Sequence, residues 1–212
     1  MIQSIDLFNQ MIDTKEKILD TAERLFGERG YAATSLRQVI AAAKVNIAAV
    51  HYHFGSKEDL LDAVVVRKAG PVTAARLALL DKVEASAKGK LKVEDVLQAF
   101  LLPTADMAQR SPQFVTLVGR LFAEGIMPRI FEKHFKSSML RFLAALGRAL
   151  PHLSQEELLW RVHFMIGAMA HTMCGSPVMH MIGTPTDFET RMTRLVGFLT
   201  GGFRAPGESG GK

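Results

Sequence analysis

Apolar residues recur at helical spacing near the start of the chain. Ile18, Ala22, Leu25 and Phe26 share one face of a segment over 14–27, and charged residues occupy the other face. This spacing predicts an amphipathic helix that ends in the glycine-containing stretch just after it.

Two short helices separated by a turn are predicted next. Ser35, like the threonine before it, is a favourable N-cap residue for the first of them. The short apolar face of that helix consists of Leu36, Val39, Ile40 and Ala43. After a turn over 44–46, Asn46 is expected to cap a helix over 47–53. Ser56 then caps a further helix, which the Gly70–Pro71 pair is expected to end.

Prolines divide the remainder into segments with helical periodicity. These segments are Val72–Ala87, Val93–Met107, Gln113–Glu124, Arg129–Leu150, Ser154–Gly175 and Thr186–Phe203. No stretch shows sustained alternation of apolar and polar residues, so the predicted fold class is all-α.

The predicted domain organisation has two parts. Residues 1–62 form an N-terminal three-helix domain, and the fourth helix, which begins at the end of this domain, links onward to about residue 70. Residues 71–203 form a larger helical domain, and 204–212 are expected to be a disordered tail.

Composition narrows the class of protein. With 48% apolar residues in 212, the chain can build a substantial core. The single cysteine, Cys174, excludes an internal disulfide and fits a reducing cytoplasm. No basic segment precedes an apolar run at the start, and no uncharged apolar run is long enough to span a bilayer. We therefore expect a cytoplasmic protein without a membrane segment.

The distribution of charge says more than the net charge of +5. Residues 1–70 carry nine basic and nine acidic side chains, so bulk basicity gives no argument for DNA binding. However, no Asp or Glu occurs from Arg29 to Lys57, although Arg37 and Lys44 lie within that window. A surface that approaches phosphates is expected to lack carboxylates, because each of them repels the polyanion.

Residues 14–62 resemble the TetR family of bacterial transcription regulators. The resemblance is carried by ILDTAERLFGERGYAATSL and by VIAAAKVNIAAVHYHFGSKEDLL, which match the family's first helix and its helix-turn-helix with the following helix start. It implies an all-α homodimer that binds double-stranded operator DNA through the N-terminal domain and a ligand through the C-terminal domain. No cofactor is implied.

The resemblance also assigns DNA-contacting positions. They are Thr34, Ser35, Arg37, Asn46, Ala48, Ala49, His51, Tyr52, His53 and Lys57. Small side chains such as Ala48 let the backbone approach the groove, and Arg37 suits a guanine or a phosphate. Simpler interpretations remain for several positions: Val50 and Phe54 are expected in the core, and His53 is as well suited to packing as to contact.

Two residues depart from the family pattern. Lys44 stands in the turn where glycine is usual, which predicts a left-handed backbone position that is strained or shifted. His51 stands where a tyrosine-like or small residue is commoner, which leaves the base preference open.

The C-terminal half is rich in aromatic and methionine side chains, which suit an apolar ligand. The predicted ligand-binding residues are Phe100, Phe114, Arg120, Phe122, Phe142, Arg161, Phe164, Met165 and Met169. For each apolar residue alone, plain core packing is the simpler interpretation. An arginine suits a carboxylate or acyl head group, although Arg161 fits an interfacial salt bridge equally. Segment 158–173 also resembles family members that respond to fatty-acid or acyl compounds.

The family resemblance places the homodimer interface on Ser154–Gly175 and Thr186–Phe203. The overall prediction is a repressor that a small apolar effector, fatty-acid-like or drug-like, releases from a palindromic operator. The alternatives are a helical binding module and a metal-responsive regulator.

Metal binding and catalysis are weaker hypotheses. His163, His171 and Cys174 share a helix, but no carboxylate or second cysteine joins them, so no metal site is predicted. The sequence contains no glycine-rich phosphate loop, nucleophile elbow or zinc-protease motif, so an enzyme is not predicted.

Overall fold

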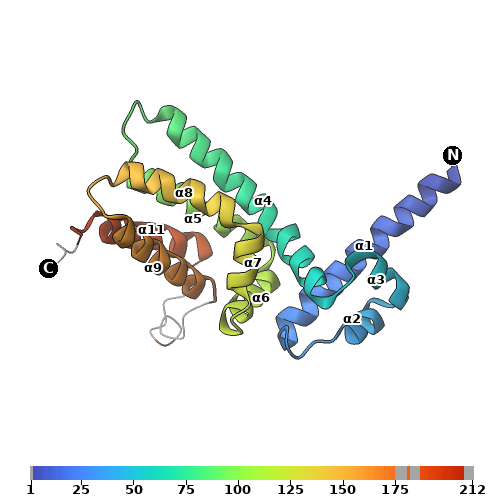
Figure 1. The fold of residues 1–212 in the computed structure, drawn as a ribbon. Helices are drawn as coiled ribbons and strands as arrows, with labels where there is room; N and C mark the ends of the chain where they lie inside the picture. Colours follow the sequence, from blue (N-terminus) through green and yellow to red (C-terminus); the bar gives the residue numbers. More distant parts are fainter. Residues whose placement is uncertain (1, 175–180, 182–186, 208–212) are drawn as a thin grey trace. The chain divides into compact units, whose positions relative to one another are not determined.

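Every regular element that the computed structural model describes is an α-helix (Figure 1). The description covers residues 2–174, 181 and 187–207. The helices are α1 (Ile2–Arg29), α2 (Leu36–Ala43), α3 (Ile47–Phe54), α4 (Lys57–Ser86), α5 (Val93–Arg110), α6 (Pro112–Ala123), α7 (Met127–His134), α8 (Lys136–Ala149), α9 (Gln155–Cys174) and α11 (Phe188–Arg204). The predicted all-α fold is confirmed.

The helices divide between two compact units. The first comprises residues 1–70 and 113–128, and the second comprises 71–112 and 129–212. The first unit thus includes most of α6, which the sequence-based limits had placed in the second domain. Helix α4 contributes to both units.

Three helices form the base of the first unit. Helix α1 packs against α2 and α3, which also pack against each other. Its core includes the fully buried side chains of Ile18, Leu25, Phe26 and Val39. Burying each such side chain stabilises the fold by about 1.5–3 kcal/mol, so the apolar faces predicted from the sequence hold this unit together.

Helix α6 reaches α1 closely because of a glycine. A Cβ atom added at Gly27 would lie 3.3 Å from the carbonyl oxygen of Gln113 and 3.9 Å from Cβ of Leu117. A larger residue at this position would therefore push the two helices apart. Phe114, on α6, is buried.

An ion cluster joins α1 to α4 within the first unit. The guanidinium of Arg67 lies 2.8 Å from a carboxylate oxygen of Glu16, 2.8 Å from Asp20 and 2.7 Å from Glu23. Glu23 is buried, and Lys68 lies 3.5 Å from its other oxygen. Removing one member of such a buried pair is costly because it leaves the partner charge uncompensated.

The second unit is a stack of helices around α5. Helix α11 packs against α5 and α9, and α8 packs against the same two helices (Figure 1). The rings of Phe100 on α5 and Phe142 on α8 meet edge to face, with centroids 5.0 Å apart. Arg141 on α8 binds the α4 carboxylates Asp81 and Glu84 at 2.7 and 2.6 Å.

The predicted end of a helix at Gly70–Pro71 is wrong. Helix α4 continues through Pro71 to Ser86. A proline inside a helix costs roughly 3 kcal/mol through a lost hydrogen bond and a clash. Buried apolar residues on both sides, Val65 and Val72 among them, offset that cost. The pair instead lies at the limit between the two units.

Two further predictions need correction. The single segment Arg129–Leu150 is divided into α7 and α8 at Phe135. The predicted disordered tail begins too early, because Arg204 ends α11 and Ala205 and Pro206 accept hydrogen bonds. Residues 208–212 lie outside the described part of the chain.

Candidate nucleic-acid interface

Local capping fixes the ends of α2 and α3. The hydroxyl of Ser35 accepts a hydrogen bond from the Gln38 backbone N–H at 3.3 Å, and the Gln38 side chain accepts one from the Ser35 N–H at 2.7 Å. This reciprocal pair is a capping box. Asn46 caps α3 by accepting from the Ala48 N–H at 3.0 Å. Both predicted caps are confirmed.

Lys44 ends α2 in the left-handed conformation, with φ 53° and ψ 45°. The sequence predicted such a position there, because lysine replaces the usual glycine. A side chain with a Cβ atom is strained in this region. The turn therefore stores strain and at the same time places an exposed cation between α2 and α3.

Helix α3 has one buried face and one exposed face. Val50 and Phe54 are buried, as predicted for core positions. The opposite face presents Ala48, His51 and Tyr52, of which Tyr52 is 73% exposed. A short helix with small and polar residues on its free side can enter the major groove of DNA.

The ring of His51 is held by the C-terminus of its own helix. Its Nδ1 lies 3.1 Å from the carbonyl oxygen of Gly55. In the neutral ring, Nδ1–H then donates to that oxygen, and Nε2 is left as an acceptor. Such an acceptor pairs with the amino groups of adenine or cytosine in the major groove.

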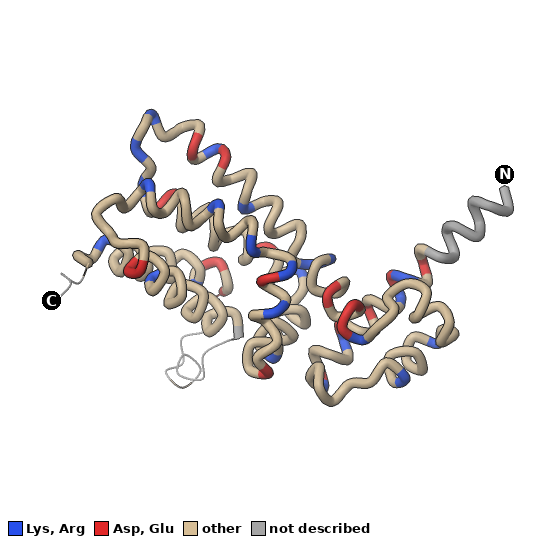
Figure 2. Tube along the Cα trace, viewed as in Figure 1, with Lys and Arg blue, Asp and Glu red and all other residues tan. Residues whose placement is uncertain are grey.

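The charge pattern predicted from the sequence lies on one part of the first unit. Figure 2 shows no acidic residue along α2 and α3, whereas α1 and the start of α4 carry several. The basic residues there, Arg37 and Lys44, are exposed. A phosphate could approach these cations without meeting a carboxylate on the same helices.

Lys57, which was predicted to contact a phosphate, also makes a contact within the first unit. Its Nζ lies 4.1 Å from the centre of the Tyr31 ring, a cation–π contact. Burial lowers the pKa of Lys57, and the Glu124 carboxylate opposes that shift. Lys57 therefore also holds the loop between α1 and α2.

The side chain of Thr34, which was predicted to contact a phosphate, points into the first unit. The residue is buried, and its hydroxyl donates to the carbonyl oxygens of Gly30 at 2.8 Å and Leu25 at 3.3 Å. It closes the end of α1. Ser35 is exposed, although its hydroxyl serves the capping box.

Glu124 is a residue of this unit that sequence reasoning missed. Its carboxylate accepts hydrogen bonds from the backbone N–H groups of Tyr31 at 3.2 Å and Ala32 at 3.1 Å. Gly30 makes room for it, because φ is +89° there and an added Cβ would lie 2.7 Å from a Glu124 oxygen. Glu124 follows these residues by more than ninety positions, so no local pattern could reveal the contact.

Two family models match the chain. Residues 18–64 match the bacterial regulatory proteins of the tetR family, and residues 98–202 match the tetracyclin repressor-like C-terminal domain. The chain belongs to the TetR family. The match to the first model covers both α2 and α3.

A curated TetR relative matches a short part of the chain. Over 48 residues the chain is 52% identical to the HTH-type transcriptional repressor Rv3405c of Mycobacterium tuberculosis (strain ATCC 25618 / H37Rv), which is 23% of this chain and 26% of that protein. The chain thus spans about a quarter of the length of such a curated relative.

Solved structures of the TetR family share the whole fold. A regulator from Shewanella sp. PV-4 matches with a TM-score of 0.67 and 15% identity, covering 89% of this chain and 97% of that one. The fatty acid degradation regulator FadR from Bacillus halodurans matches with a TM-score of 0.61 and 18% identity, covering 89% and 99%. At these identities the likeness shows the fold alone.

The residues predicted to bind a ligand fall into both units. Phe114, Arg120 and Phe122 belong to α6 in the first unit. The second unit holds Phe100, Phe142, Met165 and Met169, of which all but Met169 are buried. Phe164 is 62% exposed on α9 and stacks on Trp160, so it lies on a free helix face.

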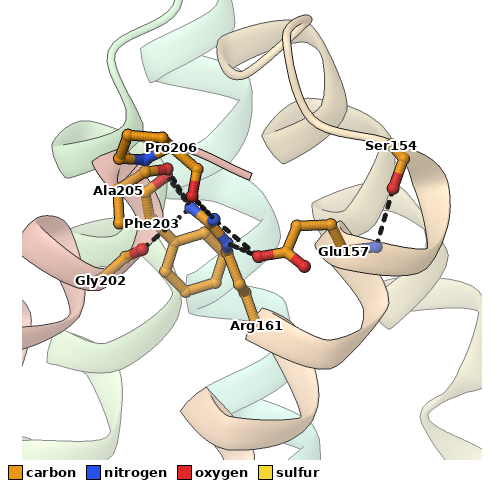
Figure 3. A network of polar contacts seen from close by, with 7 residues as sticks. All are labelled: Ser154, Glu157, Arg161, Gly202, Phe203, Ala205 and Pro206. Atoms are coloured by element: carbon orange, nitrogen blue, oxygen red, sulfur yellow. Dashed lines mark hydrogen bonds and ion pairs between the residues drawn. The ribbon is translucent and has the colours of Figure 1, made fainter. Parts of the chain in front are cut away.

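Arg161, predicted to bind a ligand head group or to form an interfacial salt bridge, is engaged within its own chain. It is buried, and Nη1 donates to the carbonyl oxygens of Gly202, Phe203 and Ala205 at 2.8–2.9 Å (Figure 3). Nη2 donates to Pro206 and to the Glu157 carboxylate. These acceptors use most of the guanidinium donors, and the side chain caps the C-terminus of α11.

Metal binding and membrane insertion find no support in the described residues. No group of three or more potential ligands lies together among them, and the Cys174 side chain falls outside them. No described helix is long and apolar enough to cross a membrane. The matched families are those of regulators and not of enzymes.

Proposed function

We propose that this protein is a ligand-responsive transcriptional repressor that reads operator DNA with α3. The observation that carries the proposal is the exposed face of α3, with small residues and an oriented histidine, on an acid-free pair of helices. TetR regulators bind operator DNA and form homodimers.

The residues of the interface divide into two classes. Ala48, His51 and Tyr52 face outward and read base edges, with His51 accepting from adenine or cytosine. Arg37, Lys44 and Lys57 bind phosphates and set the position of the protein on the duplex. Ala49 and His53, both partly buried, support the approach of the backbone.

The dimer is proposed to form through α9 and α11. These helices carry large apolar side chains that are exposed in the single chain, including Trp160, Phe164 and Phe198. Monomeric proteins rarely leave so many such side chains on adjacent helices. A two-fold dimer would present two α3 helices to one duplex, so the operator is expected to be a near-palindrome.

The effector is proposed to be a small apolar compound bound in the second unit. Aromatic and methionine side chains of α5, α8 and α9 supply the apolar surroundings. Helix α4 takes part in both units, so a ligand that displaces its second half also acts on the unit that holds α3. Ligand and operator would then weaken each other's binding by the same factor.

Footprinting on the DNA upstream of the protein's own gene tests the proposal. A protected near-palindrome is expected, and fluorescence anisotropy then gives its affinity at several salt concentrations. Arg37→Ala should weaken binding and lower the salt slope by about one unit. Arg110→Ala is the matched control, because Arg110 is an equally exposed arginine on α5, paired with Asp106.

The alternative is a helical binding module that no longer reads DNA. Absence of any protected site, with equal and weak affinity for operator and random duplexes, would favour this alternative. If operator binding by Arg37→Ala and by Arg110→Ala had the same salt slope, Arg37 would not be a phosphate contact. If no apolar compound changed the operator affinity, the protein would be a repressor that does not respond to such a ligand.

A further inference from the structure

Arg76 occupies an unusual position in the second unit. It lies on the second half of α4 and is partly buried against α5 and α9. Its Nε donates to the carbonyl oxygen of Phe100 at 2.6 Å, and its Nη2 donates to Oγ1 of Thr104 at 2.8 Å. Nη2 also lies 3.6 Å from the Met169 sulfur. These contacts hold the guanidinium in one orientation.

The charge of Arg76 is not balanced by a carboxylate. Three other arginines of the same unit are paired with carboxylates: Arg141 with Asp81 and Glu84, Arg148 with Glu84, and Arg161 with Glu157. Within the described chain, Arg76 forms no ion pair with Asp or Glu. Its partners are a carbonyl, a hydroxyl, a thioether and the Phe100 ring, which lies 4.1 Å away.

Burial lowers the pKa of Arg76 to about 10. This shift reflects the cost of holding a cation where water is scarce and no counter-ion is present. At neutral pH the group is still protonated. A negatively charged group arriving at Arg76 would therefore remove an existing electrostatic penalty.

The guanidinium has donors to spare for such a group. An arginine carries five N–H groups, and the described contacts use those of Nε and Nη2. Nη1 carries two N–H groups, and neither donates to an acceptor among the described residues. Nη1 is also not fully buried. This edge of the guanidinium is therefore the one open to a ligand.

The surroundings of Arg76 define the rest of the ligand. The Phe100 ring under the guanidinium meets the Phe142 ring, and the Met169 sulfur lies 3.6 Å from Nη2. No second Lys or Arg contacts Phe100, Thr104 or Met169 in the described part of the chain. One cation in apolar surroundings suits a single negative charge better than the doubly charged head of a phosphate monoester.

We propose that Arg76 binds the carboxylate of a monoanionic amphiphile whose apolar part packs against Phe100, Phe142 and Met169. This inference rests on the proposed function and narrows its effector from any apolar compound to an organic acid. Arg76 replaces Arg120 and Arg161 as the head-group residue. Because Arg76 belongs to α4, the ligand would bind directly to the helix that both units share.

Isothermal titration of the full-length protein without DNA tests this assignment. Decanoate, decanol and acetate are compared, because they separate the carboxylate from the apolar chain. Decanoate is expected to bind at least about tenfold more tightly than decanol, and this factor corresponds to about 1.4 kcal/mol. Acetate is expected not to saturate. Equal affinity for decanoate and decanol would overturn the proposal.

Variants assign the preference to one residue. Arg76→Met keeps the length and removes the charge, so the acid and the alcohol should bind equally. Arg76→Lys keeps the charge with fewer donors and should retain part of the preference. Arg110→Met, at an exposed arginine of α5, is the control and should keep all of it. A preference unchanged in Arg76→Met would overturn the assignment.

A measurement on the unaltered protein covers the case in which Arg76→Met does not fold. The Nε–H resonance of Arg76 should shift on addition of decanoate and stay in place with decanol. Failure of this inference is distinguishable from failure of the proposed function. Release of operator DNA by neutral compounds alone would refute only the carboxylate site, whereas decanoate binding without any operator would refute only the repressor.

Discussion

Lys44 shows how one residue can serve two opposing demands. The α2–α3 turn needs a left-handed residue, which glycine adopts without steric cost, but lysine adds a cation beside α3. The left-handed conformation of Lys44 lowers the stability of the first unit. Its positive charge is proposed to favour binding to phosphates.

Lys44→Gly should therefore raise the free energy of unfolding of the first unit by about 1 kcal/mol, because the left-handed conformation loses its Cβ clash. Urea denaturation measures the change. Operator affinity should fall in the same variant, with a smaller salt dependence, because one phosphate contact is lost. Lys44→Asn is the matched control, since asparagine tolerates the left-handed region and also lacks the charge. If the glycine variant were less stable than the asparagine variant, the left-handed conformation at residue 44 would not be strained.

Asp187 gives α11 a contribution to stability that depends on pH. Its carboxylate accepts hydrogen bonds from the backbone N–H and the hydroxyl of Thr190, at 2.7 and 2.8 Å. These bonds lower the pKa of Asp187 below its ordinary value of 3.8. The stabilisation is fully present above that ordinary value and is lost as the pH falls through the lowered one.

Asp187→Asn should flatten this dependence, because asparagine caps a helix without titrating. The melting temperature of the wild type is expected to fall more steeply than that of the variant as the pH falls below about 4. Other carboxylates titrate in both proteins and cancel in the difference. Parallel curves for the two proteins would show that the cap contributes nothing to folding.

At the scale of elements, local signals predicted α2 and α3 well and long-range contacts not at all. Ser35 and Asn46 sit at caps that sequence chemistry alone can place, and Val50 and Phe54 follow from helical spacing. Arg76 went unnoticed because its partners come from α5 and α9. The contacts of Arg161 with α11 could not be predicted because these acceptors are backbone carbonyls, which carry no sequence signature.

Glu124, which directly follows α6, supports the loop between α1 and α2. Glu124→Gln should weaken the two hydrogen bonds to that loop, because a neutral amide is a poorer acceptor and offers one oxygen in place of two. The expected loss is about 1.5–3 kcal/mol, typical of hydrogen bonds to a charged group. Faster hydrogen exchange at the Tyr31 and Ala32 amides measures it directly.

The control for this change is Glu132→Gln on α7. Glu132 is exposed and, among the described residues, pairs with Lys136 one turn away, so its loss should cost no more than about 0.5 kcal/mol. Unchanged exchange at Tyr31 and Ala32 in Glu124→Gln would mean that α1 and α2 hold the loop without α6.

At the scale of the whole molecule, the proposed dimer decides whether one α3 or two meet the operator. Phe198 on α11 is 76% exposed and Phe164 on α9 is 62% exposed. Phe198→Glu should place a charge in the proposed interface and convert the dimer to a monomer, as light scattering coupled to gel filtration would show. Operator affinity should fall with it, because each monomer then binds one half-site.

Leu140→Glu on α8 is the matched control, since Leu140 is 54% exposed outside α9 and α11. This variant should remain dimeric. A monomeric wild type, or a dimer unaffected by Phe198→Glu, would place the interface elsewhere.

The contact between Arg161 and the end of α11 has a consequence for how this chain can change over generations. Four of its acceptors are main-chain oxygens, at Gly202, Phe203, Ala205 and Pro206, and every amino acid supplies that atom. Substitutions at Ala205 and Pro206 can thus accumulate without breaking the contact, whereas a stop codon or frameshift that removes these residues cannot be tolerated equally. The contact therefore depends on the path of the backbone at this terminus and on the side chains of Arg161 and Glu157, but not on the side chains of Ala205 and Pro206.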